Sequence, residues 1–443
     1  MAESAGATDR VAFSRPLLGL ILGQVCVHAA MAGTRLAVPL QALEQGAAAW
    51  IVGLLLAMFA LAPVALALPA GRLADRHGYH RPMRLAVLMA ASGVALAACS
   101  QALMGRSAIP LGLHLAVLAL AATLAGAGTN IGLIAIQRSA GHLATTGTER
   151  MRVFSWLGLA PAVANVIGPL IAGAAIDLGG FVLAFVLMAA LPLASLALAP
   201  LVPKERARKG TTSAEPTARL STVDTTAVVQ AATRRPSMLQ SARELMLRPG
   251  MRRLLLVNWL ISASWDVHTF LVPVLGHERG LSASAIGLVL GVFAASVAGV
   301  RLLIPFIAHR LTEIQSLRGS MLLTAAVFAV YPLAQSAVTM AACAVVLGLA
   351  LGAVQPMIMS SLHRLTPANR HGEALALRSM TINAASTVMP LVFGAVGTAL
   401  GATTLFWTMA AAVGGGSRLV GALKRVLIEA KPAQASEPDA ARP

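Results

Sequence analysis

The chain has 443 residues, of which 57% are hydrophobic and only 12% are charged, and its mean hydropathy is +0.77. Soluble globular domains carry about 25% charged residues, so this composition excludes an ordinary soluble protein and indicates a membrane protein. The formal net charge is +17. No basic domain with base-stacking aromatic residues accompanies it, so the charge does not indicate nucleic-acid binding.

About twelve segments are long and apolar enough to cross a bilayer, which requires roughly 20 helical residues. In chain order they lie near residues 17–40, 50–70, 84–104, 110–137, 153–177, 180–202, 251–275, 283–307, 319–335, 337–362, 376–400 and 403–428. The polar stretch 203–250 divides them six and six. We therefore predict an all-α membrane protein with 12 transmembrane helices in two bundles. The bundles are residues 17–202 and 251–428, with a cytoplasmic N-tail at 1–16 and a disordered cytoplasmic tail at 429–443.

The connection 203–250 is predicted to be a cytoplasmic linker. Its first part is rich in Ser, Thr, Ala and Arg and has few large apolar groups, which predicts disorder. After Pro236, apolar residues from Met238 to Met246 recur at helical spacing, which predicts a short helix lying on the inner membrane face. A tether between the two halves is its simplest role.

The basic residues indicate the orientation in the membrane. Of the 34 Lys and Arg residues, the connections on one side hold only Arg106 and Arg279, whereas nearly all the others lie on the side of the termini. Basic residues are retained on the cytoplasmic side. We therefore expect both termini in the cytoplasm and the chain in a bacterial-type inner membrane, whose anionic lipids account for the net positive charge.

A short basic motif separates the second and third predicted spans. It comprises Gly71, Leu73, Ala74, Asp75, Arg76, Gly78 and Arg81. This motif resembles the loop between helices 2 and 3 that marks the major facilitator superfamily, a large family of secondary transporters, although Tyr79 and His80 depart from its basic positions. The resemblance implies two parallel six-helix bundles with a substrate cavity between them. We further hypothesise that the motif is a conformational gate, in which Asp75 faces the amino end of the eleventh span near residue 376.

An internal repeat is consistent with two such halves. A shift of 234 residues aligns Pro39 with Pro273, Glu44 with Glu278, Gly53 with Gly287 and Phe59 with Phe293, and a second shift of 221 residues aligns Pro169 with Pro390. The spans 17–40 and 50–70 therefore echo 251–275 and 283–307. The second copy of the basic motif, at residues 309–313, is degenerate.

The fifth predicted span carries Gly168, Pro169 and Gly173. Their spacing resembles a signature associated with antiporters in the superfamily. Pro169 removes a backbone donor and the glycines permit close helix contact, so the segment suits a gate, with plain packing as the alternative.

In the fourth span, Ala122 occupies the place of an arginine that many proton-coupled drug exporters carry. Proton coupling through that position is therefore excluded.

Ionisable residues inside spans are costly, so they are functional candidates. The first span carries His28 and Arg35, and the seventh carries Asp266 and His268. Both spans border the cavity in the superfamily fold. We therefore predict that Arg35 and Asp266 meet across it and that Asp266 takes and releases protons. A permanent structural ion pair is the alternative for Arg35 and Asp266, and hydrogen-bonded packing is the alternative for the histidines.

Asn130, Asn258 and Arg301 are further polar candidates inside spans. Asn130 and Asn258 are predicted either to line the cavity or to form hydrogen bonds between helices. Arg301 lies near one end of its span, so it is expected to extend to the cytoplasmic interface.

These features predict secondary active transport of a small organic molecule by alternating access, with proton-coupled efflux by antiport as the leading hypothesis. The alternatives are an uptake symporter for a small anionic or zwitterionic metabolite and a transporter-shaped membrane sensor or assembly factor. No phosphate loop, zinc-binding His pair or nucleophile elbow is present, so we expect no enzyme activity, cofactor or metal site. The expected partners are the substrate, protons and membrane lipids, and the expected state is a monomer.

Overall fold

A computed structural model describes residues 14–143, 147–203, 244–248, 250–307, 312–366 and 370–429. The regular elements within these ranges are helices. They are α2 (Arg15–Glu44), α3 (Ala49–His77), α4 (His80–Met104), α5 (Leu111–Leu143), α6 (Gly147–Leu198), α9 (Met251–Glu278), α10 (Ala283–Ile307), α11 (Glu313–Val330), α12 (Ala337–Leu365) and α13 (His371–Glu429), with short 3-10 turns η1 (Ala199–Leu201) and η3 (Tyr331–Leu333).

These ten helices are each long and apolar enough to cross a membrane. The 52-residue α6 contains two predicted spans, because Gly179 and Gly180 leave helical geometry and Gly180 has φ 73°. A straight helix of that length would measure about 78 Å, against roughly 30 Å for a hydrocarbon core. Gly33 of α2 lies close to both Gly168 and Met188, on the two sides of the break, so α6 reverses there. The predicted spans 153–177 and 180–202 are therefore confirmed as separate crossings.

The 59-residue α13 is divided in the same way. Gly401 has φ 80°, which an L side chain rarely adopts, and the helix breaks at this residue. Asn258 of α9 accepts a hydrogen bond from Arg378, and Leu260 of α9 lies close to Gly416. Because Arg378 and Gly416 stand on opposite sides of the break yet meet the same turn of α9, α13 also folds back on itself.

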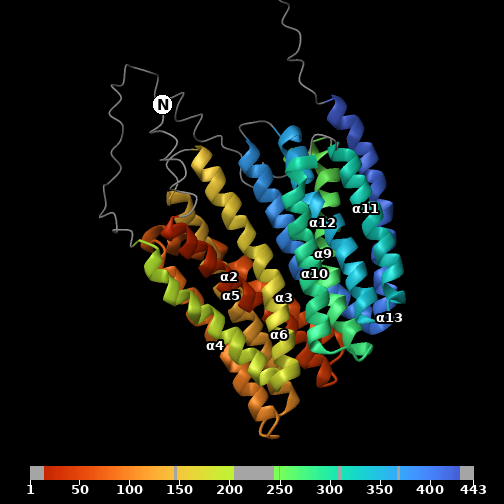
Figure 1. Cartoon of the computed structure of the whole chain (residues 1–443). Coiled ribbons are helices and arrows are strands. Elements are labelled where there is room, and N and C mark those ends of the chain that lie inside the picture. The colour runs from red at the N-terminus through yellow and green to blue at the C-terminus, as the bar shows by residue number, and fades with distance from the viewer. Residues whose placement is uncertain are drawn as a thin grey trace, which may run out of the picture.

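The helices form two neighbouring bundles (Figure 1). Helices α2 to α6 pack mainly on one another, with α2 inserted deeply against α6, and α9 to α13 do the same in the second half. Since every crossing reverses the chain, α2 begins at the same face at which α13 ends. We call this the terminal face. The opposite, distal face carries the connections at residues 45–48, 105–110, 179–180, 279–282, 331–336 and 401.

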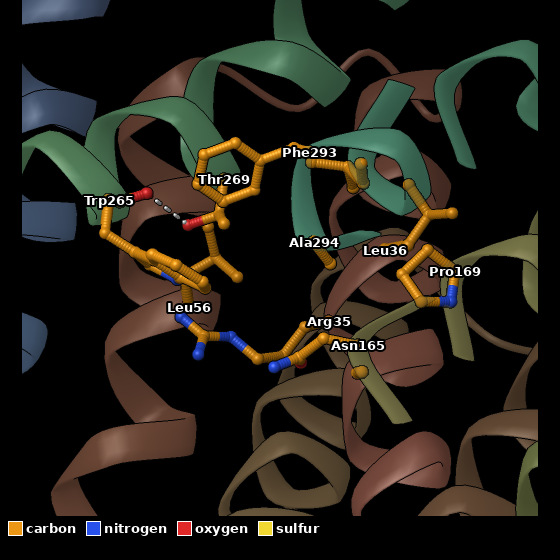
Figure 2. A pocket seen from close by; sticks show the side chains of 11 residues that line it. Arg35, Leu36, Leu56, Asn165, Pro169, Trp265, Thr269, Phe293 and Ala294 are labelled. Atoms are coloured by element: carbon orange, nitrogen blue, oxygen red, sulfur yellow. Dashed lines mark hydrogen bonds between the residues drawn. The ribbon is translucent and has the colours of Figure 1, made fainter. Parts of the chain in front are cut away.

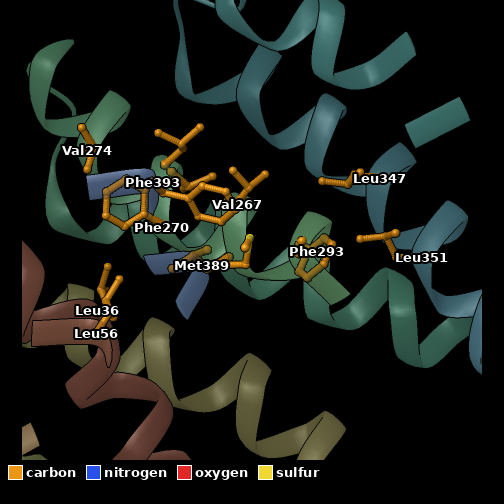
Figure 3. Packing of buried hydrophobic residues seen from close by; sticks show 14 of the residues in the cluster. Leu36, Leu56, Val267, Phe270, Val274, Phe293, Leu347, Leu351, Met389 and Phe393 are labelled. Atoms are coloured by element: carbon orange, nitrogen blue, oxygen red, sulfur yellow. The ribbon is translucent and has the colours of Figure 1, made fainter. Parts of the chain in front are cut away.

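The core joins both halves near the distal face. Phe270, Met389 and Phe393 of the second half pack together, and Leu36 and Leu56 of the first half lie against the same cluster (Figure 3). The outer surface is apolar as well, with Leu88, Leu178 and Val338 exposed at 62%, 84% and 78%. Exposed apolar side chains of this kind are suited to lipid rather than to water.

The basic motif differs from the sequence prediction in one respect. It is expected as a loop, but α3 continues through Gly71 and Asp75 to His77, and only Gly78 and Tyr79 form the turn. Ala70 and Ala74 are buried, so this helical extension has a packed face. Arg76 and His77 lie in its last turn, where positive charge complements the helix dipole, and Gly78 ends it with φ 65°.

Most of the predicted linker and both tails lie outside the described residues. Within the linker, Glu244–Leu247 is helical and Leu245 is fully buried. Glu244 forms an ion pair with Arg370, just before α13, at 3.2 Å. The predicted interfacial helix from Pro236 is therefore described only at its end.

Candidate functional site

The distal halves of the two bundles meet through glycine residues. A Cβ atom at Gly173 of α6 would collide with the Ala283 carbonyl of α10, and one at Gly287 of α10 would collide with the Pro169 carbonyl. Gly168 makes a similar close approach to Gly33 and Ala29 of α2 within the first half. The predicted helix-5 motif thus lies in the contact between the halves, where the backbones touch because side chains are absent.

Two polar contacts accompany this closure. The carboxylate of Asp177, on α6, accepts hydrogen bonds from the backbone nitrogens of Ala283 and Ser284 at 3.0 and 2.8 Å. On the other seam, α3 and α13 approach at Gly53 and Gly394, and the backbone nitrogen of Trp50 donates to the Thr398 hydroxyl at 2.9 Å. The distal face is therefore closed along both seams.

A cavity of about 340 Å³ lies between the bundles, on the terminal side of this closure. It is lined by Arg35, Asn165, Asn258, Ile261, Ser262, Trp265, Asp266, Arg301, Leu351, Val354, Gln355, Ile358, Arg378, Ile382 and Ser386. Arg301 and Gln355 are exposed, whereas Asp266 is only 5% exposed. The cavity therefore extends from the terminal face toward the middle of the bundle, and the conformation is open to the terminal face.

The deep end of the cavity brings Arg35 and Asp266 together. They come from α2 and α9, in different halves, and interact electrostatically without a direct ion pair. Asp266 accepts a hydrogen bond from the Ser386 hydroxyl of α13 at 3.3 Å. A carboxylate and a guanidinium that face one space without neutralising each other directly can each bind another partner, such as a proton or an anionic group.

A smaller cavity of about 60 Å³ adjoins Arg35 (Figure 2). Figure 2 shows the Arg35 side chain extending along the wall of this cavity toward Trp265. Asn165 lies beside Arg35, and Pro169 lies at the right of the view, away from Trp265. Thr269 donates to the Trp265 carbonyl at 3.2 Å, within α9. Pro169 also belongs to the closed seam between α6 and α10. The smaller cavity is therefore lined both by Arg35 and by a residue of the distal closure.

The two histidines do not line either cavity. His268 is fully buried in an aromatic cluster, with ring centres 4.2 Å from Phe293 and 5.8 Å from Tyr331, and its Nε2 lies 3.3 Å from the Tyr331 hydroxyl. His28 lies on α2 with a buried Nδ1 that has no hydrogen-bond partner among the described residues. The surroundings of His268 are therefore those of a packed polar group within the second bundle.

The two asparagines have different surroundings. The Asn130 side chain of α5 donates to the Pro63 carbonyl of α3 at 3.4 Å, which is a contact between helices of one half. Asn258 lines the cavity and is 2% exposed, and its side-chain oxygen accepts from the Nε of Arg378 at 3.2 Å.

At the terminal face, the gate motif lies apart from the cavity. Asp75 accepts from the Nε of Arg138 on α5 at 3.2 Å, and its side chain is 77% exposed. This contact stays within the first half, so the predicted contact of Asp75 with the start of the eleventh span stays a prediction for another conformation. Gly71 and Arg76 lie on α3 with Asp75, and Arg81 lies at the start of α4.

Several residues of the larger cavity have no counterpart in the sequence prediction, among them Asn165, Gln355, Arg378 and Ser386. Its position along the sequence predicts that Arg301 extends to the membrane interface, whereas both Arg301 and Arg378 line the cavity. Both are one or two turns from a helix end, where position along the sequence does not reveal which way a long side chain points. The signal that was available is a charge on an otherwise apolar helical stretch.

The described residues contain no group of three His, Cys, Asp or Glu side chains that could hold a metal ion. The site is therefore built from guanidinium, carboxylate, amide and hydroxyl groups. These groups suit binding of a polar organic molecule by charge and hydrogen bonds.

Comparison with solved structures shows transporters of the same fold. A peptide transporter of the POT family, in complex with a thioalcohol-conjugated peptide, superimposes with a TM-score of 0.70 at 14% identity, covering 94% of this chain and 99% of the other. A bacterial homologue of the iron transporter ferroportin, in an inward-facing state, has a TM-score of 0.66 at 18% identity, covering 94% and 98%. A bacterial metal transporter has a TM-score of 0.63 at 17% identity, with the same coverage.

Family comparison agrees with the fold. A search of curated proteins finds no match. The family model described as the Major Facilitator Superfamily matches residues 20–337 and 254–442. Together these matches span both bundles, including the gate motif, the closed distal seams and the cavity. The chain belongs to the major facilitator superfamily of secondary transporters.

Proposed function

We propose that this transporter exports a small anionic or zwitterionic organic compound in exchange for protons, from a bacterial-type inner membrane with both termini in the cytoplasm. It acts as a monomer. The observation that carries this proposal is the pair of Arg35 and Asp266, which come from opposite halves and face one cavity without a direct ion pair.

The charge of the cavity supports the substrate class. Arg35 has no hydrogen-bond or ion-pair partner among the described residues, yet it lines both the larger and the smaller cavity. A guanidinium in a confined site binds carboxylate or phosphate groups through paired hydrogen bonds. Trp265 offers an apolar and aromatic surface beside it, which suits the organic part of such a compound.

Asp266 supports coupling to protons. It is the acidic residue among the cavity-lining side chains, and it lies between Arg35 and the Ser386 hydroxyl. A carboxylate inside a membrane span is costly when charged and isolated, so its protonation is sensitive to what occupies the cavity. An anionic group bound next to Arg35 weakens the stabilisation of the Asp266 carboxylate by Arg35, so occupancy of the cavity and the protonation of Asp266 are linked.

The direction of transport is supported by the helix-5 motif. Gly168, Pro169 and Gly173 resemble the antiporter signature, and Pro169 and Gly173 lie in the seam that α6 forms with α10. In antiport, the protein must not switch between its two open conformations at a significant rate while the cavity is empty. A seam that is tightly closed until the cavity is occupied serves this requirement.

The test is flux in proteoliposomes that contain the purified full chain. An imposed pH gradient should drive accumulation of organic anions or zwitterions from a defined panel, and Arg35→Gln should lower the affinity for them at least about tenfold. Arg318→Gln, on the exposed surface of α11, is the matched control. Flux of neutral or cationic compounds only, or flux insensitive to the pH gradient, would contradict the proposal.

Uptake by proton symport is the second candidate. The same cavity would bind an anionic or zwitterionic metabolite, and one of the similar solved structures is a POT family transporter in complex with 5-aminolevulinic acid, a zwitterion. The two directions differ in one measurement. In antiport, substrate moves against the proton flow, whereas in symport both move the same way across the liposome membrane.

A further inference from the structure

The cavity has two levels of polar residues, which can be assigned from the helix geometry. Asn258 and Asp266 are eight residues apart on α9, and Arg378 and Ser386 are eight apart on α13. Eight residues of α-helix correspond to about 12 Å. The hydrogen bonds from Arg378 to Asn258, at 3.2 Å, and from Ser386 to Asp266, at 3.3 Å, hold the two helices in this register.

Arg301 belongs to the level of Arg378. Phe293 of α10 packs on Trp265 of α9 with ring centres 4.7 Å apart, next to Asp266. Because α10 runs toward the terminal face, Arg301, eight residues later, lies about 12 Å nearer to that face. We call Asn258, Arg301, Gln355 and Arg378 the terminal tier, and Arg35, Asn165, Asp266 and Ser386 the middle tier.

Both tiers have guanidinium groups free to bind a ligand. In the described part of the chain, Arg301 has no hydrogen-bond or ion-pair partner. Arg378 uses its Nε for Asn258, which leaves its two terminal nitrogens without a partner there. Asn258 in turn has a buried side-chain nitrogen with no partner. The terminal tier therefore offers several hydrogen-bond donors and no carboxylate.

The total charge of the cavity is not balanced. Its lining contains three arginines and one aspartate, so with Asp266 ionised the excess is two positive charges. An occupant carrying two negative charges would neutralise this excess.

From this arrangement we propose that the substrate is an elongated organic dianion. One anionic group binds Arg35 in the middle tier, and the other binds Arg301 and Arg378 in the terminal tier. The inference rests on the proposed function of the same cavity, and it adds the number and the spacing of the anionic groups. The amides of Asn258 and Gln355 complete the second site by hydrogen bonding, and Ile261 and Ile382, which lie between the two tiers on α9 and α13, contact the apolar chain between the two groups.

The test compares linear dicarboxylates with monocarboxylates. Binding of malonate, glutarate, adipate and suberate, and of hexanoate as the singly charged counterpart, is measured by calorimetry on the full chain in lipid nanodiscs. The longer diacids should bind at least about tenfold more tightly than hexanoate, which corresponds to roughly 1.4 kcal/mol. Malonate, whose two carboxylates are too close to reach both tiers, should show no such advantage.

Substitutions assign the second site. Arg301→Gln and Arg378→Gln should reduce diacid affinity to that of hexanoate while leaving hexanoate binding unchanged, and Arg301→Lys should retain part of the advantage because the charge is kept. Arg35→Gln should weaken both ligands. Arg252→Gln, on the exposed side of α9, is the matched control and should change neither.

Two outcomes would overturn the proposal. One is that no diacid binds better than hexanoate, and the other is that Arg301→Gln and Arg378→Gln weaken both ligands equally. Binding needs no gradient, so a preference for diacids together with flux that ignores pH would contradict only the proposed proton coupling. Proton-driven flux of monoanions without a diacid preference would contradict only the present inference.

Discussion

The carboxylate of Asp177 in the first half accepts hydrogen bonds from the backbone nitrogens of Ala283 and Ser284, which begin α10 in the second half. The first N–H groups of a helix have no partner inside the helix, and a negative charge there is stabilised by the helix dipole. Because the two partners belong to different halves, this contact exists only while the distal face is closed. It therefore stabilises the conformation that is open to the terminal face.

Replacing Asp177 should favour opening of the distal face. Loss of a helix-capping side chain costs about 0.5–2 kcal/mol, which is a shift of roughly 2- to 30-fold in a two-state equilibrium. We expect Asp177→Ala to broaden the distance distribution between spin labels at Arg106 and Leu333, on distal connections of the two halves, toward longer distances. Cys26, Cys99 and Cys343 are replaced beforehand.

The matched control for this variant is Glu44→Gln, which removes an exposed carboxylate of the same face that has no part in the seam. An Asp177→Ala distribution indistinguishable from that of Glu44→Gln would mean that the carboxylate does not stabilise the closure. Asp177→Asn should lie between the two, because the amide oxygen still accepts a hydrogen bond without the charge.

The seam between α6 and α10 should not tolerate a side chain at Gly173. A Cβ atom there meets the Ala283 backbone rather than a flexible side chain, so neither helix can yield without opening the seam. We expect Gly173→Val to lose nearly all transport and to remain open at the distal face, as measured with the same pair of labels. Gly158→Val, in the same helix but with open space around its Cβ, should transport like the parent. Equal activity of the two variants would exclude a gating role for this contact.

The gate motif provides a corresponding prediction for the terminal face. We expect Asp75 to face the start of α13 when the terminal face closes, in the way that Asp177 faces the start of α10 in the present conformation. A carboxylate at a helix start contributes about 0.3–1 kcal/mol when exposed and more when partly buried. Asp75→Asn should therefore slow turnover several-fold while leaving substrate affinity nearly unchanged.

Arg138 makes this prediction specific. Asp75 is paired with Arg138 in the present conformation, and exposed ion pairs of this kind are worth at most about 1 kcal/mol. If the slow turnover came from loss of that pair, Arg138→Gln would reproduce it. We expect Arg138→Gln to turn over at close to the parent rate. Equal defects in Asp75→Asn and Arg138→Gln would mean that the slow turnover comes from loss of the ion pair and not from loss of the contact between Asp75 and α13.

The sequence predicts the fold well because a membrane span is a local property. Length and hydropathy located the crossings, and Gly179, Gly180 and Gly401 divide α6 and α13 close to where the predicted spans end. The site is less local. Arg35 and Asp266 could be placed at one cavity through the superfamily resemblance, since each stands alone as a charge in its span.

The role of Arg301 in the cavity could not be predicted from the sequence, for a physical reason. Whether Arg301 extends to the interface or into the cavity depends on the rotation of α10 against α9 and α12, which hydropathy does not encode. Asp177 accepts its hydrogen bonds from the start of a helix more than one hundred residues away along the chain, and a backbone N–H group carries no side-chain signature. Contacts that backbone groups and long side chains make across the two halves can therefore be identified only from the structure.

The last prediction concerns Asp266 as the coupling residue. Substitution by Asn keeps the shape and the hydrogen bond with Ser386 but can neither bind nor release a proton. We expect Asp266→Asn in proteoliposomes to lose accumulation driven by a pH gradient, while exchange of labelled for unlabelled substrate, which needs no net proton movement, continues. His268→Gln is the matched control, because His268 lies in the aromatic cluster outside the cavity, and it should keep proton-driven accumulation. If Asp266→Asn still concentrates substrate under the imposed gradient, the coupling residue lies elsewhere, and loss of accumulation in His268→Gln or in a His28→Gln variant would identify it.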